Sequence, residues 1–228
     1  MKMDKAAAEK AITGYFAKHS ACMKATLTKS TGGKIYELFC LAKTLEWLRS
    51  TYRVSIRLVN GTTVNFKASP GNIDRSRSYF VISKGPKYLE LHTDIQVETL
   101  GASMIGGLCD RSGYHEIDLV LIDPSVPDVG MPRHDQVLLG VECKSHAKFE
   151  KGILKQVLGI RRELSLLSQP TVSNLEDFFG PVMHFGDSSP IVNANPASLY
   201  WVAYVDPKGN DYKISPSSFS IEFKHWEP

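Results

Sequence analysis

Three side chains that could act together on a metal ion lie in two apolar stretches of the sequence. Asp118 stands in YHEIDLVLID, and Glu142 and Lys144 close QVLLGVECK. Side chains of a strand alternate between its two faces, so Glu142 and Lys144 share a face, while Cys143 points the other way. If the two stretches pair as a hairpin, Asp118 can lie across from Glu142. The sequence therefore predicts two carboxylates and one ammonium group in the same place.

This combination of groups suits phosphodiester hydrolysis. Two neighbouring carboxylates repel each other, and their pKa values rise unless a cation lies between them. Hard oxygen ligands favour Mg²⁺ or Mn²⁺. A lysine two residues past the second acid lies within reach of an attacking water or of the scissile phosphate. The alternatives are an acid at an exposed edge and a local Glu142–Lys144 ion pair. The apolar neighbours argue against the former, because a lone buried carboxylate is costly.

The elements that must position these residues are those of an α/β domain, with helices packed on a central mixed sheet. Apolar residues at three-and-four spacing predict a helix over 34–51, and a near-continuous apolar run makes 136–144 a central strand. Asn60-Gly61 predicts a hairpin between two strands. Glycines make 101–113 a mobile loop. The other predicted elements are a helix over 4–19, strands 53–59, 62–68, 78–83, 87–99 and 114–123, a helix over 149–167, a polar loop over 185–197, and strands at 198–205 and 219–223.

Ile117-Asp118 followed by Glu142-Cys143-Lys144 resembles the PD-(D/E)XK nuclease signature of the restriction-endonuclease-like superfamily. Ile117 stands where the motif name has proline, a position that varies in that family. The resemblance implies a single nuclease domain over 1–228, with an αβββαβ core at 34–205. Residues 1–33 would then be an N-terminal helical extension, and residues 206–228 a C-terminal one.

The resemblance also implies roles for individual residues. Asp118 and Glu142 would ligate Mg²⁺ or Mn²⁺, with the backbone carbonyl of Cys143 as a third ligand. Lys144 would activate or orient water. Glu37 borders the apolar face of helix 34–51 and would supply a further acid, unless it is a plain surface acid. Gln156 would orient Lys144 or a phosphate, unless it merely decorates its helix. Glu116, on the predicted face of Asp118, is either another ligand or solvated.

A nuclease needs basic groups for the phosphate backbone, and DNA is the favoured partner. The net charge of +3 permits a polyanionic partner without demanding one. Lys151, Lys155 and Arg162 lie opposite the apolar stripe of helix 149–167, as in any amphipathic helix, and Lys148 and Arg161 add charge nearby. Arg75 and Arg77, in the loop before Tyr79, are similar candidates for phosphate contact. The candidate nucleic-acid-binding residues are Lys148, Lys151, Lys155, Arg111 and His146.

Three other functions remain open from the sequence. The site could cleave RNA, because the metal chemistry at phosphorus is shared. The chain could be a non-catalytic nucleic-acid-binding or assembly module of the same fold. It could also be an unrelated α/β protein in which the motif is coincidental. For the nuclease we favour restriction or defence over repair. We find no helix-turn-helix or zinc-finger pattern, so specificity would come from loops, a homodimer or a partner protein.

Composition places the chain among ordinary globular proteins, with 43% apolar and 22% charged residues in 228. Its four cysteines form no CxxC pair, which argues against a zinc site and favours reduced thiols. No stretch approaches the roughly 20 apolar residues of a membrane helix. No apolar core of a signal peptide follows the charged N-terminus. We therefore expect a cytoplasmic protein without membrane contacts.

Overall fold

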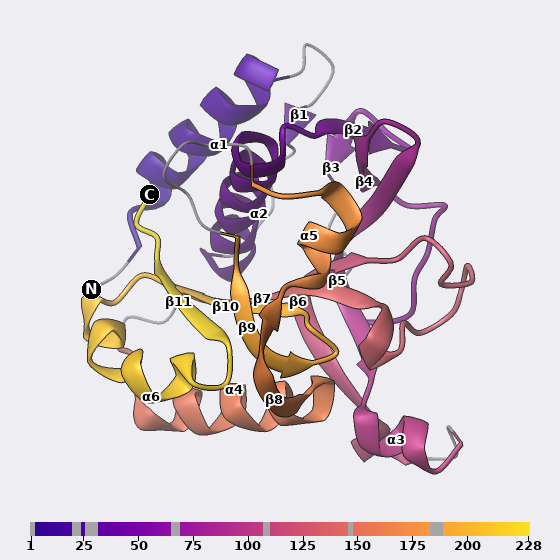
Figure 1. Ribbon diagram of the computed structural model, residues 1–228. Helices are drawn as coiled ribbons and strands as arrows, with labels where there is room; N and C mark the ends of the chain where they lie inside the picture. The colour runs from indigo at the N-terminus through magenta and orange to yellow at the C-terminus, as the bar shows by residue number, and fades with distance from the viewer. Residues whose placement is uncertain are drawn as a thin grey trace.

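A seven-stranded mixed sheet carries helices on both faces in the computed structural model (Figure 1). The structure describes residues 3–19, 24–25, 32–64, 69–106, 110–145, 148–182 and 189–228. The predicted α/β class, with a mixed sheet flanked by helices, is confirmed. In spatial order the strands are β11 (Ile221–His225), β10 (Leu199–Tyr204), β7 (Val137–Lys144), β6 (Tyr114–Ile122), β5 (Lys87–Glu98), β4 (Tyr79–Lys84) and β2 (Ser55–Val59).

Strand β7 is central, as its apolar run predicts. It pairs antiparallel with β6 and parallel with β10, and its residues 137–142 are all buried. Gly140 packs closely there, because a Cβ atom at this position would lie 3.0 Å from the ring of Tyr200, and a larger residue would require that ring to shift. Strands β10 and β11 are also parallel, so residues 221–225 of the predicted C-terminal extension belong to the main sheet.

Helix α2 (Gly32–Tyr52) covers one face of the sheet together with α1 (Lys5–His19). The apolar stripe predicted for α2 is buried, and Ile12 and Phe16 of α1 join the same core. We call this core the α2-side cluster. Helix α4 (Lys151–Leu164) covers the opposite face with Val157, Ile160 and Leu164, which form the α4-side cluster with residues of the sheet.

Strands β5 and β6 change faces midway along their length. In β5, Leu91 packs in the α2-side cluster, whereas Ile95 packs in the α4-side cluster. In β6, Leu119 packs in the α2-side cluster and Ile117 packs in the α4-side cluster. Strict alternation predicts that these two residues share a face, and this prediction is wrong here. The change in β5 occurs at Asp94, whose backbone is left-handed with φ +55°.

A neighbouring segment explains the backbone of Asp94. The Gly71 N–H donates to the Asp94 carbonyl at 3.1 Å, and the Gln96 N–H donates to the Gly71 carbonyl at 3.0 Å. These bonds draw the backbone of β5 out of its regular pairing with β6. The register on either side, His92 with Val120 and Ile95 with Ile117, places Asp94 opposite Asp118.

Two predicted local elements differ in the structure. Asn60 (φ +54°) and Gly61 form a turn, but β2 pairs with β4, and β3 (Thr63–Val64) pairs with β1 (Lys24–Ala25), so the predicted hairpin is wrong. Residues 65–68 lie outside the described part. The segment 101–113, predicted as a loop, contains most of helix α3 (Leu100–Met104) and a 3₁₀ turn at Arg111–Gly113.

The connection from α4 to β10 also differs from prediction. Helix α4 ends at Leu164 instead of 167, because Ser165 is extended and its hydroxyl donates to the Pro196 carbonyl at 3.1 Å. The chain then forms β8 (Leu166–Val172), which pairs with β9 (Ile191–Asn195) where a polar loop was predicted. The remaining short helices of the described fold are α5 (Asn174–Phe179), α6 (Ile214–Ser217) and 3₁₀ segments at His134–Gln136 and Pro207–Tyr212.

Arg161 has a structural position and not the phosphate-facing one considered from sequence. Its side chain is buried and donates to the Phe219 carbonyl at 3.0 Å, the Ser198 hydroxyl at 2.9 Å and the Ser198 carbonyl at 2.8 Å. Burial lowers the pKa of Arg161 to about 10, so the group is still charged at neutral pH. It ties α4 to the start of β10 and to the turn before β11.

We expect Arg161→Met to lower the free energy of unfolding by about 2–4 kcal/mol, because it leaves buried carbonyls without donors. Urea unfolding followed by circular dichroism measures this. Arg162→Met is the matched control, because Arg162 is exposed on the same helix and should change stability by less than about 0.5 kcal/mol. Equal losses in both variants would show that Arg161 does not hold the connection together.

Among the described residues, no helix combines the length and apolarity needed to cross a membrane. Cys40 and Cys143 are free thiols, as predicted for those two; Cys22 and Cys109 lie outside the described part.

Candidate active site

The antiparallel pairing of β6 and β7 brings Asp118 to Glu142. Leu119 pairs with Val141 and Val120 with Gly140, so one further step along the register sets Asp118 opposite Glu142. The Cys143 N–H donates to Asp118 Oδ2 at 2.6 Å. The Asp118 carboxylate is therefore held against the backbone of β7.

Lys144 lies beside Glu142, as their two-residue spacing on one strand predicts. Its Nζ donates to Glu142 Oε2 at 2.8 Å, and the two side chains are only 12% and 5% exposed. Burial alone would lower the pKa of Lys144. The charge of Glu142 and the hydrogen bond to it outweigh burial, and the pKa ends above its ordinary value. The ammonium group is therefore charged at neutral pH.

Asp118 is the carboxyl whose proton affinity is most disturbed. Burial first, and then the charge of Glu142, raise the pKa of Asp118 to about 8, although the Cys143 N–H acts in the opposite direction. Burial also raises the pKa of Glu37, against the hydrogen bond from Lys34. Without a cation, the site is thus short of positive charge.

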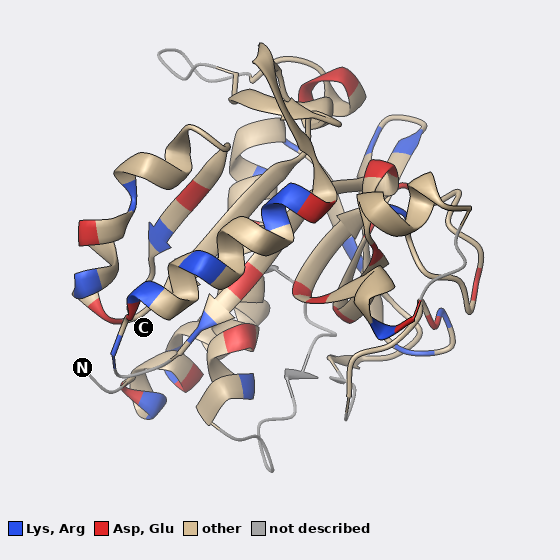
Figure 2. Cartoon of the chain, turned by 90° about the horizontal axis from the view of Figure 1, so that it is seen from below, with Lys and Arg blue, Asp and Glu red and all other residues tan. Residues whose placement is uncertain are grey.

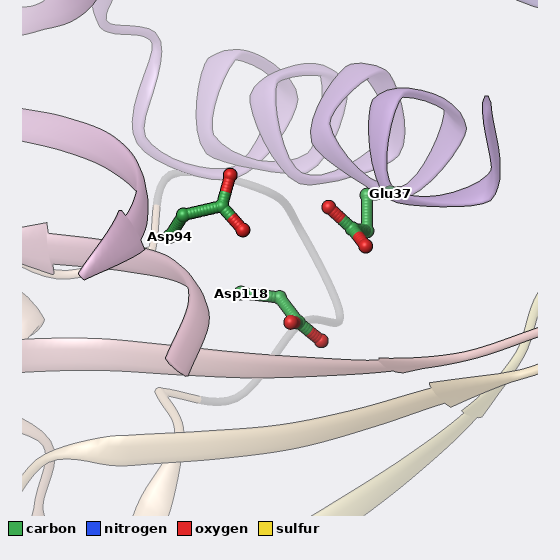
Figure 3. A group of neighbouring side chains, drawn as sticks. All are labelled: Glu37, Asp94 and Asp118. Atoms are coloured by element: carbon green, nitrogen blue, oxygen red, sulfur yellow. The ribbon is translucent and has the colours of Figure 1, made fainter. Parts of the chain in front are cut away.

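Glu37, Asp94 and Asp118 form an acidic cluster, in which one carboxylate oxygen of each lies within 4.8 Å of the others (Figure 3). Figure 3 shows Glu37 pointing down from α2 towards the two acids of the sheet. Asp94 was not predicted as a site residue. An acid between Thr93 and Ile95, in a strand whose apolar residues predict burial, is the signal that could have identified it, because a buried acid requires a partner.

Lys34 forms ion pairs with two acids of the cluster. Its Nζ lies 2.6 Å from Glu37 Oε2 and 2.5 Å from Asp94 Oδ1. Burial lowers the pKa of Lys34, but the hydrogen bonds to Asp94 and Glu37 more than offset this effect, so its pKa is raised.

The donor set suits a hard divalent cation. The atoms that converge are carboxylate oxygens, the ligands preferred by Mg²⁺ and Mn²⁺. Asp94 Oδ2, from an acid of the cluster, and Glu142 Oε1, from the strand next to Asp118, are buried and make no hydrogen bond to any described residue. Buried carboxylate oxygens in this condition are costly, and a bound cation would satisfy them.

No protein-family model, curated protein or solved structure matches this chain. Inference about its activity therefore rests on the residues of the cluster and on their surroundings.

The sequence contains a second ExK triplet, which provides a comparison within the same sheet. Glu222 and Lys224 of β11 form an ion pair across the same two-residue spacing. Among the strands that the structure describes, β11 pairs with β10 alone, so no acid-bearing strand like β6 lies beside it there. The pairing of β7 with β6, more than the triplet itself, distinguishes the Glu142–Lys144 pair.

The basic residues predicted to meet nucleic acid lie on and before α4. Lys151 and Lys155 are exposed, and Figure 2 looks onto α4 with its Lys and Arg bands facing the viewer. Gln156 is also exposed on α4. Lys148 forms an ion pair with Glu150 at 3.2 Å.

Two further predicted contacts lie elsewhere. Arg111 is exposed in the 3₁₀ turn before β6 and lines a hollow with Glu98, Tyr114 and Met131. His146 lies outside the described residues. Glu116, considered as an extra ligand, is exposed and does not belong to the acidic cluster.

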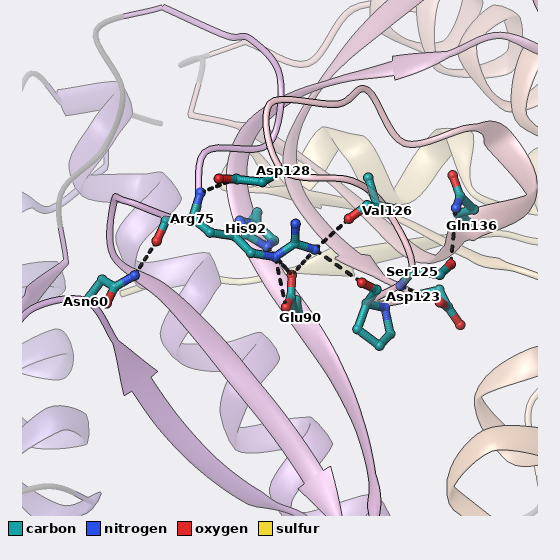
Figure 4. A network of polar contacts seen from close by, with 10 residues as sticks. Asn60, Arg75, Glu90, His92, Asp123, Ser125, Val126, Asp128 and Gln136 are labelled. Atoms are coloured by element: carbon teal, nitrogen blue, oxygen red, sulfur yellow. Dashed lines mark hydrogen bonds and ion pairs between the residues drawn. The ribbon is translucent and has the colours of Figure 1, made fainter.

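Arg75, considered for phosphate contact, is instead part of a structural network (Figure 4). Its Nε donates to both carboxylate oxygens of Glu90 at 3.1 and 2.9 Å, and its Nη2 donates to the Val126 carbonyl at 2.8 Å. His92 lies 3.1 Å from Glu90 in the same network. These bonds connect β5 to the turn after β6, and the guanidinium is occupied by them. Arg77 is paired with Asp74 at the surface.

Proposed function

We propose that this protein is a metal-dependent nuclease of the PD-(D/E)XK type, which hydrolyses phosphodiester bonds. The observation that carries the proposal is the approach of Asp118 to Glu142, with Lys144 2.8 Å from Glu142 and the Cys143 N–H 2.6 Å from Asp118. When β2–β4, α3 and the β8, α5, β9 segment are counted as insertions, the remaining order α2, β5, β6, β7, α4 and β10 agrees with the αβββαβ order of that superfamily. Glu37 reaches the acidic cluster from the first of these helices.

The residues that would hold Mg²⁺ or Mn²⁺ are Asp118, Glu142, Glu37 and Asp94, with the Cys143 carbonyl as a further ligand. When bound, the cation supplies Lewis-acid stabilisation of the charge that develops on a phosphate group and makes a water molecule more acidic. The protein supplies the positions of the ligands. Asp118 is fixed by the Cys143 N–H, and Glu142 is fixed by Lys144.

We infer that Lys144 acts on the substrate. Its ammonium group is charged and mostly shielded from solvent, so its attraction to a phosphate oxygen is less screened than in water. Lys144 can leave Glu142 for a phosphate, or orient the attacking water between the two. Either role stabilises negative charge as the bond to phosphorus forms.

For the substrate we propose DNA, in restriction or defence, with a cytoplasmic location. Lys151 and Lys155 are available for phosphate contacts on the exposed face of α4. Gln156 is proposed to orient a phosphate or Lys144, and Arg111 and Lys148 to add backbone contacts. A homodimer or a partner protein would supply sequence specificity.

Cleavage of supercoiled plasmid with Mg²⁺ or Mn²⁺ tests this proposal. We expect nicking or linearisation by the wild type that is abolished by EDTA, and a loss of about 10²–10³-fold in Lys144→Ala, because a preorganised charge at the reacting centre is removed. Lys224→Ala is the matched control, since it breaks the second Glu–x–Lys pair of the same sheet and should leave cleavage unchanged.

Equal activity in the wild type and Lys144→Ala would place the activity elsewhere or assign it to a contaminant. If plasmid is not cleaved, the same comparison is made on single-stranded DNA and on RNA. Metal-dependent cleavage of RNA alone would make the protein a ribonuclease. Tight, metal-independent binding without cleavage of any substrate would favour the non-catalytic binding module.

A further inference from the structure

Lys34 sits where a cation would bind the acidic cluster. Its ammonium group contacts Glu37 at 2.6 Å and Asp94 at 2.5 Å, and those two acids lie with Asp118 in one group of converging oxygens. It thereby neutralises part of a negative charge that would otherwise be buried without compensation.

The charges around this point are unequal. The cluster has three carboxylates, those of Glu37, Asp94 and Asp118, and one ammonium group in contact with two of them, that of Lys34. Their formal charge is 1 − 3 = −2 when all are ionised, equal and opposite to that of one divalent cation. Lys144 is paired with Glu142, so Lys34 is the base that forms ion pairs with acids of the cluster.

Lys34 is also able to leave. Its side chain is 30% exposed, whereas that of Asp94 is 4% exposed, and a lysine stem is flexible. Lys34 belongs to the first turn of α2, which begins at Gly32. The ammonium group is therefore more exposed to solvent than either acid that holds it, since the Glu37 side chain is 13% exposed.

We propose that the Lys34 ammonium is an exchangeable internal counter-ion, which neutralises Glu37 and Asp94 in the metal-free protein and is displaced when a divalent cation binds the Glu37–Asp94–Asp118 cluster. This inference rests on the proposed metal site. A divalent cation and the ammonium group compete for the same carboxylate oxygens. The protein thus exchanges one cation for another instead of exposing an uncompensated acidic cluster.

Competition predicts tighter metal binding when the ammonium group is removed. We expect Lys34→Met to lower the Kd for Mn²⁺ by about 10- to 100-fold, in line with the loss of two charge-assisted hydrogen bonds that no longer have to be broken. Isothermal titration of the full chain with Mn²⁺ measures the Kd without reference to cleavage. Lys43→Met is the matched control, because Lys43 pairs with Glu46 on the same helix, about 13 Å further along its axis.

A measurement on the wild type keeps the proposal testable if Lys34→Met does not fold. Acetylation of lysines at limiting reagent, followed by mass spectrometry, reports how accessible each amine is. We expect Mg²⁺ to accelerate the modification of Lys34 several-fold relative to Lys43, because displacement frees its amine from two carboxylates.

The outcomes separate this inference from the proposed function. Tighter Mn²⁺ binding by Lys34→Met, or Mg²⁺-dependent exposure of Lys34 in the wild type, supports exchange. An unchanged or weaker affinity in a folded Lys34→Met, or acetylation of Lys34 that does not respond to Mg²⁺, overturns it while plasmid cleavage can still be metal-dependent. If the wild type and Lys34→Met both bind no metal, the exchange and the metal site fail together.

Discussion

Asp118→Asn should reduce metal-dependent cleavage by about 10³-fold or more, because it removes a ligand charge at the reacting centre while preserving the shape of the side chain. The amide can still accept the Cys143 N–H through its oxygen. The variant should therefore fold, and the loss should appear in the rate of the chemical step. Initial rates of plasmid nicking at saturating Mn²⁺ measure it.

Glu116→Gln is the matched control for this result. Glu116 is two residues away on the same strand and carries the same kind of charge, but it is exposed and outside the cluster. We expect its cleavage rate to stay within about twofold of the wild type, as for a surface position that contacts neither metal nor substrate. Equal losses in both variants would show that general negative charge on β6, and not the position of Asp118, supports activity.

The metal-free protein should lose stability as the pH rises from about 4 to about 8. The pKa of Asp118 is raised from 3.8 to about 8, so within this range the folded state holds a proton that the unfolded chain has released. Rising pH therefore favours the unfolded chain, by roughly 5 kcal/mol across the window for this group, because the shift covers about four pH units at about 1.4 kcal/mol each. Urea unfolding in EDTA at several pH values measures the slope.

Most other groups with shifted pKa values change stability outside the range from about pH 4 to about pH 8. Lys34 and Lys144 have raised pKa values, so the stability they contribute is lost only above about pH 10.5. Acids with lowered pKa values, such as Glu90 and Asp206, contribute stability that is lost as the pH falls below about 4. The raised pKa of Glu37 acts in the same direction as that of Asp118.

Asp118→Asn should flatten this profile and make the metal-free protein more stable than the wild type at pH 8. Saturating Mg²⁺ should do the same for the wild type, because bound cation favours the carboxylate. A wild-type profile that rises between pH 5 and pH 8 in EDTA would contradict the raised pKa of Asp118. A fall that is unchanged in Asp118→Asn would assign the effect to another group.

The approach of Asp118, Glu142 and Lys144 could be predicted because it depends on local rules. A period of two sets Glu142 and Lys144 on one face, and an antiparallel connection sets Asp118 opposite. Asp94 was missed because its position depends on a left-handed backbone in mid-strand, and this is fixed by the hydrogen bonds with Gly71, more than twenty residues earlier. Such a tertiary contact leaves no periodic signal.

The other errors also come from tertiary contacts that override a local pattern. Asn60-Gly61 does form a turn, but β2 finds its partner in β4 and not across that turn. Leu167 continues the helical spacing of α4, yet the chain leaves the helix at Ser165, and Leu167 is 63% exposed. Its position beside Arg162 predicts that Arg161 is a surface charge. In the structure Arg161 is buried, and it donates to carbonyl groups of two distant segments.

The change of faces in β5 and β6 also limits how these strands can evolve. Leu91 and Ile95 serve opposite cores although they lie on one strand, and Leu119 and Ile117 do the same on the neighbouring strand. Because side chains alternate with a period of two, adding or removing one residue here would exchange the faces of everything beyond it. Descendants of this sequence can therefore change residue types around Asp94 and Asp118 far more readily than they can change the number of residues. Insertions and deletions should accumulate in the turns and spare this segment.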